Sequence, residues 1–105
     1  MADLATISIA GDTRNLSQVE ESWVTQQVNR RLRDGAAVCV IVRVRTTGID
    51  VSLPTPACGG GNGGGRVPNR REQDVIDLWK SHRLHTTEFT GGSVVAFLKQ
   101  LRRYV

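Results

Sequence analysis

Long apolar runs are absent from this sequence of 105 residues, and no stretch approaches the about 20 apolar residues that a membrane-spanning helix requires. The first residues, Met1 to Leu4, carry neither the basic start nor the apolar stretch of a secretory signal peptide. From these two absences we expect a cytoplasmic chain with no membrane partner.

Aromatic side chains are scarce, because the chain holds only five of them. Trp23, Trp79 and Phe97 have the spacing of core residues, so few rings remain to stack on nucleotide bases. The sequence therefore argues against a stacking platform for single strands. Any contact with nucleic acid is expected to go to the backbone.

Cysteine is also scarce, with two residues in the chain. Cys39 lies in a strongly apolar segment and is expected to be a small buried hydrophobe, whereas Cys58 opens a glycine-rich stretch. A disulfide between the two is compatible with the sequence, but a cytoplasmic location argues against it.

Patterns that support catalysis are missing as well. The glycine-rich stretch lacks the Lys-Ser/Thr pair of a phosphate-binding P-loop, since Arg66 follows its last glycine. Cys58 and Arg66 resemble the ends of a cysteine-phosphatase loop, but their spacing is longer and no histidine precedes the cysteine. His82, His85 and Glu88 are too few for a convincing metal site. We therefore expect a non-enzymatic domain without cofactor or metal.

The first part of the chain predicts a strand followed by a helix. Residues 6–9 alternate between polar and apolar, as a short strand does. Ser17 and Glu20 have the spacing of a capping box, which predicts a helix start, and Gly35 supplies a left-handed end.

The middle of the chain predicts a β-hairpin. Residues 37–44 form the strongest strand pattern, with four valines on one face and Cys39 and Ile41 on the other. Because its first part is apolar on both faces, we expect a central strand whose first part is buried on both sides. The strand turns polar at Arg43 and Arg45, so its second part is expected to emerge into solvent. Residues 49–53 alternate and return as the second arm of the hairpin.

Two further helices are expected after the glycine-rich stretch. Asn69 and Glu72 have the spacing of a capping box at the start of the first, and the glycines at 91 and 92 lead into the last. The segment 84–89 between them fits either an irregular connector or a short edge strand.

Taken in order, the elements are β-α-β-β-(glycine-rich loop)-α-α, which predicts a single α+β domain over residues 1–105. We expect a three-stranded, mainly antiparallel sheet with helices packed on one face. The first strand should lie parallel to the central one after a right-handed crossover. Six side chains are predicted to be mostly buried: Trp23, Val40, Val42, Trp79, Phe97 and Leu101.

The glycine-rich loop over residues 58–67 is the most distinctive segment, since six of the eleven glycines lie at positions 59–65. It fits a flexible tether, a nest of backbone amides that holds an anion at a helix start, or a loop that a protein partner orders. Five residues are candidates for binding an anion or an acidic partner: Gly63, Gly64, Arg66, Arg70 and Arg71.

Charge is unevenly placed along the chain. Residues 1–57 hold six arginines and six acidic residues, whereas residues 58–105 hold eight basic and four acidic residues. A basic half indicates a polyanionic partner. We expect a small protein-interaction domain. The alternative is binding of nucleic acid or a phosphate ligand through residues 58–71 and the basic C-terminal helix.

Overall fold

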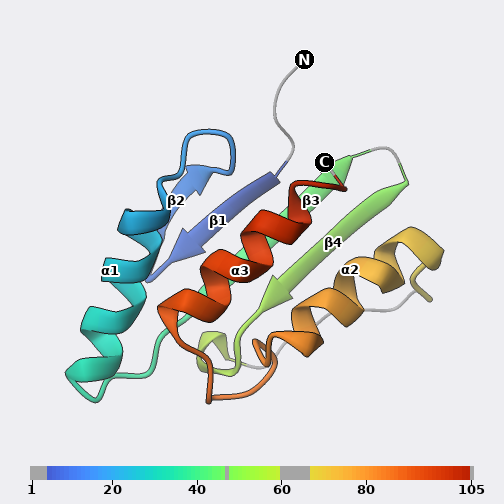
Figure 1. Ribbon diagram of the computed structural model, residues 1–105. Helices are drawn as coiled ribbons and strands as arrows, with labels where there is room; N and C mark the ends of the chain where they lie inside the picture. Colours follow the sequence, from blue (N-terminus) through green and yellow to red (C-terminus); the bar gives the residue numbers. More distant parts are fainter. Residues whose placement is uncertain (1–4, 47, 60–66, 105) are drawn as a thin grey trace.

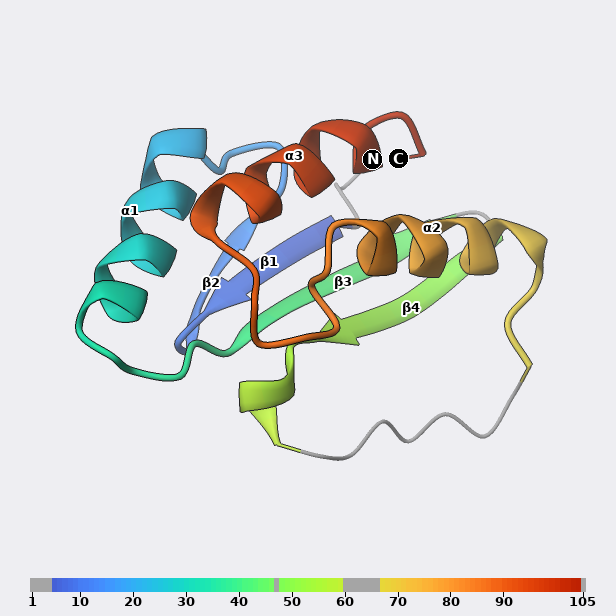
Figure 2. The same ribbon diagram turned by 60° about the horizontal axis from the view of Figure 1, so that its bottom comes forward.

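The computed structural model describes residues 5–46, 48–59 and 67–104. In this part of the chain, four strands form one antiparallel sheet in the order β2-β1-β3-β4, and three α-helices lie on one of its faces (Figures 1 and 2). The α+β class is therefore confirmed, but the sheet has four strands where the sequence predicts three. The elements are β1 (Ala5–Ile9), β2 (Asp12–Asn15), α1 (Glu21–Arg33), β3 (Val40–Thr46), β4 (Ile49–Pro54), the 3₁₀ helix η1 (Pro56–Cys58), α2 (Arg70–Ser81) and α3 (Gly91–Leu101).

The strand missing from the sequence prediction is β2. Its residues Asp12, Thr13, Arg14 and Asn15 are all polar and all exposed, so they show no alternation of apolar and polar positions. A two-residue turn joins it to β1, with positive φ at both Ala10 (53°) and Gly11 (90°), as a type I′ hairpin turn requires.

The extra strand also changes the direction of pairing. Because β2 reverses the chain before α1 begins, β3 runs antiparallel to β1, with Ile7 opposite Val42. The predicted parallel crossover between the first strand and the central strand is therefore wrong. The β3–β4 hairpin is confirmed and is also antiparallel, with Val42 opposite Leu53.

In the described part of the chain, α1, α2 and α3 all cover the same side of the sheet. Val38, Val40, Val42 and Val44 face the helices and are buried, as the sequence predicts. On the opposite side Cys39 and Ile41 are only half-buried, so the expectation that the first part of this strand is buried on both faces is wrong. Arg43 and Arg45 are exposed on this side, as predicted. The described α-helices all lie on the other face, so β3 has a strand on each side in the sheet but an α-helical layer over one face.

The first helix begins later than predicted. Its N-cap is Glu20, and no side chain caps it. Leu16 and Val19 are both buried, and the amide of Leu16 donates to the carbonyl of Ala5, 2.9 Å away. Burial of these two side chains holds residues 16–19 in a turn, so the predicted Ser17–Glu20 capping box does not form.

Gly35 ends α1 with a positive φ of 77°, as predicted. Its amide donates to the carbonyl of Leu32, and the next amide, of Ala36, donates to that of Arg31. This is the paired hydrogen bonding of a Schellman end, for which glycine is the favoured residue.

The predicted core residues are buried with one exception. Val40, Val42, Trp79, Phe97 and Leu101 are buried, and the rings of Trp79 and Phe97 meet edge to face with centroids 5.2 Å apart. Trp23 is only half-buried, because its ring packs beneath the guanidinium of Arg14 on the exposed strand β2, at 4.2 Å from the ring centroid.

A disulfide joins Cys39, just before β3, to Cys58 at the end of η1. The sequence argument against this bond is therefore wrong. The Cα atoms lie 4.6 Å apart, within the range that a disulfide spans. Thr55 brings the two segments together, because its buried hydroxyl accepts from the amide of Val40 and donates to the carbonyl of Val38, both at 3.0 Å.

Candidate functional site

The start of α2 is a capping box, as predicted from Asn69 and Glu72. The Asn69 Oδ1 atom accepts a hydrogen bond from the Glu72 amide at 2.8 Å, and the Glu72 carboxylate accepts one from the Asn69 amide at 2.9 Å. Each side chain thus satisfies a backbone donor that the helix itself leaves without a partner.

The same two side chains attach this helix start to the β3–β4 hairpin. The Asn69 side-chain amide donates to the carbonyl of Gly48 at 2.8 Å. The second oxygen of the Glu72 carboxylate accepts from the Asp50 amide, also at 2.8 Å. Glu72 is 1% exposed. These contacts fix the first turn of α2 against the hairpin, so side chains on this turn project from a well-defined backbone.

Arg70 and Arg71 lie on that first turn and are both exposed. A Cβ atom placed on Gly48 would lie 3.5 Å from the Cδ atom of Arg71, so this side chain passes over the hairpin turn. The other three candidates, Gly63, Gly64 and Arg66, lie outside the described residues. The alternatives of tether, anion nest and partner-ordered loop for the glycine-rich stretch also concern residues outside the described ranges.

Glu72 changes how this helix start can bind an anion. Its carboxylate already lies at the positive end of the helix dipole, where it offsets the nearby arginines. The amides of Asn69 and Glu72 are occupied by the capping box. An incoming anion therefore meets the guanidinium groups of Arg70 and Arg71 before it meets these two amides.

Val67 adds an apolar group to this region. Among the described residues it is the large hydrophobic side chain that stands exposed, at 88%. It precedes Pro68 and the helix cap, two residues before Asn69. Sequence reasoning missed it, because an isolated valine next to a proline carries no periodic signal. We refer to Val67, Arg70 and Arg71 together as the α2 corner.

The C-terminal end of α3 brings two more arginines to the same end of the domain (Figures 1 and 2). Arg102 and Arg103 are exposed, and the Arg102 guanidinium also donates to the carbonyl of Leu16 at 3.4 Å. This placement follows from the antiparallel course of α2 and α3, which sets the start of one near the end of the other.

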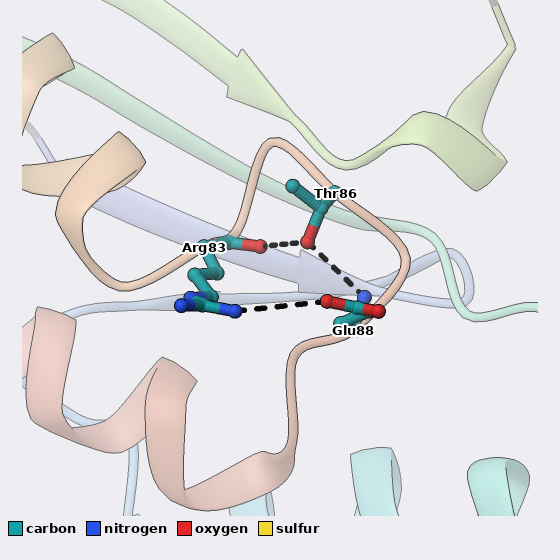
Figure 3. A network of polar contacts seen from close by, with 3 residues as sticks. All are labelled: Arg83, Thr86 and Glu88. Carbon is teal, nitrogen blue, oxygen red and sulfur yellow. Dashed lines mark hydrogen bonds and ion pairs between the residues drawn. The ribbon is translucent and has the colours of Figure 1, made fainter.

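The loop between α2 and α3 is irregular and closed by its own side chains (Figure 3). The Thr86 hydroxyl donates to the carbonyl of Arg83 at 2.7 Å and accepts from the Glu88 amide at 3.1 Å. Arg83 and Glu88 form an exposed ion pair at 3.7 Å. For residues 84–89 the sequence fits either an irregular connector or a short edge strand, and the irregular connector is confirmed.

The chemistry-bearing residues near this loop do not converge. His82 caps the end of α2 and packs against Phe97, and its buried Nε2 atom has no hydrogen-bond partner among the described residues. Over the described ranges, no group of three or more His, Cys, Asp or Glu side chains is arranged to hold a metal ion. Cys58 is bonded to Cys39, so it offers no thiolate for nucleophilic attack.

Comparison of this chain with protein-family models, with curated proteins and with solved structures finds no match. In the described part of the chain, no helix has the length and apolar character needed to cross a membrane.

Proposed function

We propose that this chain is a non-enzymatic interaction domain that binds an acidic segment of a protein partner through the α2 corner. The observation that supports this most is the exposure of Val67 beside Arg70 and Arg71, on a helix start that is fixed to the β3–β4 hairpin. Two guanidinium groups bind carboxylates, and the adjoining valine offers an apolar contact.

The rigidity of this corner favours its use as a binding surface. Ordering a flexible arginine on binding costs side-chain entropy, but the capping box and its two bonds to the hairpin already order the backbone. The backbone that carries Arg70 and Arg71 is therefore already ordered before a partner binds. Each exposed contact between a guanidinium and a carboxylate contributes about 0.2–1 kcal/mol, so the affinity is expected to be modest and salt-dependent.

A protein partner is preferred over nucleic acid because of Val67. Backbone-directed binding of nucleic acid needs cations and hydrogen-bond donors, and it gives no role to an exposed valine. A peptide with acidic residues and one apolar side chain uses all three residues of the α2 corner. Binding of nucleic acid is kept as an outcome of the test.

Fluorescence anisotropy with labelled probes tests the proposal. The probes are a hexaglutamate peptide, the same peptide with one leucine at its centre, and a 20-base-pair duplex DNA, each at 20 mM and 150 mM salt. We expect the leucine-containing peptide to bind best. Reversal of both arginines, Arg70→Glu with Arg71→Glu, should weaken peptide binding at least about tenfold, since two attractive pairs become repulsive.

Two controls make the result specific. The double variant Arg30→Glu with Arg33→Glu changes the net charge equally at exposed positions of α1. Val67→Ser removes the apolar contact and leaves every charge in place. If the α1 and α2 double variants lose the same amount of peptide affinity, the effect comes from net charge and not from the α2 corner. Tighter and steeply salt-dependent binding of the duplex would assign the corner to nucleic acid instead.

A cytoplasmic location remains a prediction, and the Cys39–Cys58 disulfide weighs against it, because cytoplasmic thiols are normally kept reduced. Thiol blocking followed by mass spectrometry, on protein taken directly from cells, distinguishes a cytoplasmic location from an oxidising one. Free thiols at both positions are expected in the cytoplasm, and a bonded pair indicates an oxidising location.

A further inference from the structure

The face of the sheet opposite the α-helices carries an arginine whose two cross-strand neighbours are hydroxyl residues. Arg43 is exposed on β3, and in the sheet register it lies opposite Thr6 on β1 and Ser52 on β4. Thr6 in turn lies opposite Asn15 on β2. The four side chains form a polar row that crosses all four strands. A carboxylate opposite an arginine would stabilise the pair of strands, and here the residues opposite Arg43 carry hydroxyl groups instead.

The positive charge of Arg45, two residues further along the same face, is only weakly balanced by a carboxylate. Its guanidinium lies 4.0 Å from the carboxylate of Asp50, its cross-strand neighbour, and both side chains are about two-thirds exposed, at 70% and 67%. An exposed pair at this distance contributes little to stability. Arg43 and Arg45 therefore present two cations, separated by about 7 Å of strand, and among the described residues Asp50 is the carboxylate beside them.

Both arginines are exposed, and they lie at the end of this face that no described element covers. Of the described elements, η1 contacts β3 on this side, near the disulfide at Cys39 (Figure 2). Arg43 and Arg45 lie toward the other end of β3, where the strand runs into the turn at Gly48. That turn is the one to which Asn69 is hydrogen-bonded, so the arginine pair and the α2 corner adjoin the same hairpin end.

We propose that the acidic segment bound at the α2 corner continues over the β3–β4 turn onto the open face of the sheet, where Arg45 and Arg43 bind its carboxylates. This inference rests on the proposed function and extends its site. The occupant is an acidic polypeptide. The described residues of this face include no aromatic ring on which a nucleotide base could stack, and they offer only two cations to a phosphate backbone.

Peptide length separates the two parts of the site. A diglutamate peptide spans at most about 7 Å when extended, whereas a peptide of 14 glutamates reaches about 50 Å. Arg43 lies three residues before the end of β3 at Thr46, about 10 Å along the strand. The longer peptide can therefore occupy the α2 corner and reach Arg43 at the same time, and the diglutamate cannot. Both peptides are labelled and titrated with the full chain by fluorescence anisotropy at 20 mM salt.

Two variants remove Arg43 from the binding surface in different ways. Arg43→Thr deletes the cation and keeps a residue that suits a strand. Ser52→Glu places a carboxylate directly opposite Arg43, where it competes internally with the partner. The matched control for added charge is Gln26→Glu, at an exposed position on α1. Thermal unfolding confirms that each variant is folded before it is titrated.

We expect both open-face variants to weaken binding of the long peptide about two- to fivefold and to leave the short peptide unchanged, with no effect of Gln26→Glu. Unchanged binding of the long peptide to Arg43→Thr would overturn the inference, as would equal losses for the short and long peptides. Charge reversal at Arg70 and Arg71 should weaken the binding of both peptides. This separate result tests the α2 corner itself. Tighter binding of a 14-nucleotide single strand that depends on Arg43 would replace the acidic polypeptide as occupant.

Discussion

The buried carboxylate of Glu72 accepts a hydrogen bond from the backbone amide of Asp50, 22 residues earlier in the chain, at 2.8 Å. This one bond joins the first turn of α2 to the edge strand β4. It also satisfies an amide at the edge of the sheet, where unpaired groups invite pairing with another chain. The orientation of the α2 corner therefore depends on a side chain that the partner does not need to contact.

Replacing Glu72 should loosen this attachment. Glu72→Ala removes acceptors from the Asn69 and Asp50 amides and an anion from the helix start, and is expected to cost about 2–4 kcal/mol of unfolding free energy. Glu72→Gln keeps one acceptor and the shape of the side chain, so it should cost about half as much. Urea unfolding of both variants measures the difference. A loss below about 0.5 kcal/mol in the alanine variant would show that this bond does not hold the helix.

Gly91 and Gly92 form a matched pair at the start of α3. A Cβ atom on Gly91 would lie 2.9 Å from the carbonyl oxygen of Thr25 on α1, whereas one on Gly92 meets only Thr90 Oγ1, at 3.7 Å. Gly91→Ala should therefore destabilise the domain by about 1–3 kcal/mol. Gly92→Ala should be neutral or stabilising by up to about 1 kcal/mol, because alanine is the better helix former. Thermal denaturation compares the two, and equal effects would contradict the close approach of α1 and α3.

The hydroxyl of Thr55 is expected to be more important than its methyl group. Thr55→Val leaves the Val38 carbonyl and the Val40 amide without their partner in a buried position, at a cost of about 1–3 kcal/mol. Thr55→Ser keeps both bonds and loses about one methyl group of buried surface, about 0.8 kcal/mol. Chemical denaturation should give the Thr55→Ser variant a higher free energy of unfolding than the Thr55→Val variant. The reverse order would show that the two hydrogen bonds of the hydroxyl do not stabilise the segment after β4.

Reduction of the Cys39–Cys58 disulfide should lower stability without unfolding the domain. The bond closes a loop across 19 positions and so lowers the conformational entropy of the unfolded chain. In the loop-entropy description this raises the free energy of unfolding by about 3 kcal/mol. Unfolding of the wild-type chain with and without a dithiol reductant measures this difference. The variant Cys39→Ala with Cys58→Ala serves as the control, because it should not respond to the reductant.

The sequence predicts the elements that depend on local chemistry and misses those set by packing. The Asn69–Glu72 cap and the stop at Gly35 follow from side chains within a few residues, and both are confirmed. Ser17 has the same local pattern, but burial of Leu16 and Val19 overrides it. Packing against distant parts of the chain leaves no mark in the pattern of residues one helical turn apart, so the sequence alone does not show it.

The strand β2 and the candidate site illustrate the same limit. An exposed edge strand of four polar residues has no apolar face, so alternation cannot reveal it. Once it is missed, the direction of β1 against β3 is also assigned wrongly. Arg70 and Arg71 could be selected from their place at a helix start. Arg43, by contrast, stands out only after the register shows that Thr6 and Ser52 are its neighbours.

The position of binding can be measured directly by nuclear magnetic resonance. Amide chemical shifts of the ¹⁵N-labelled chain are followed during titration with the leucine-containing hexaglutamate peptide. We predict saturable shifts at Val67 to Glu72 and at Gly48 to Asp50, because these backbone segments are hydrogen-bonded to one another at the α2 corner. Shifts that are confined to α1, or that are absent at millimolar peptide, would contradict the claim that this corner receives an acidic partner.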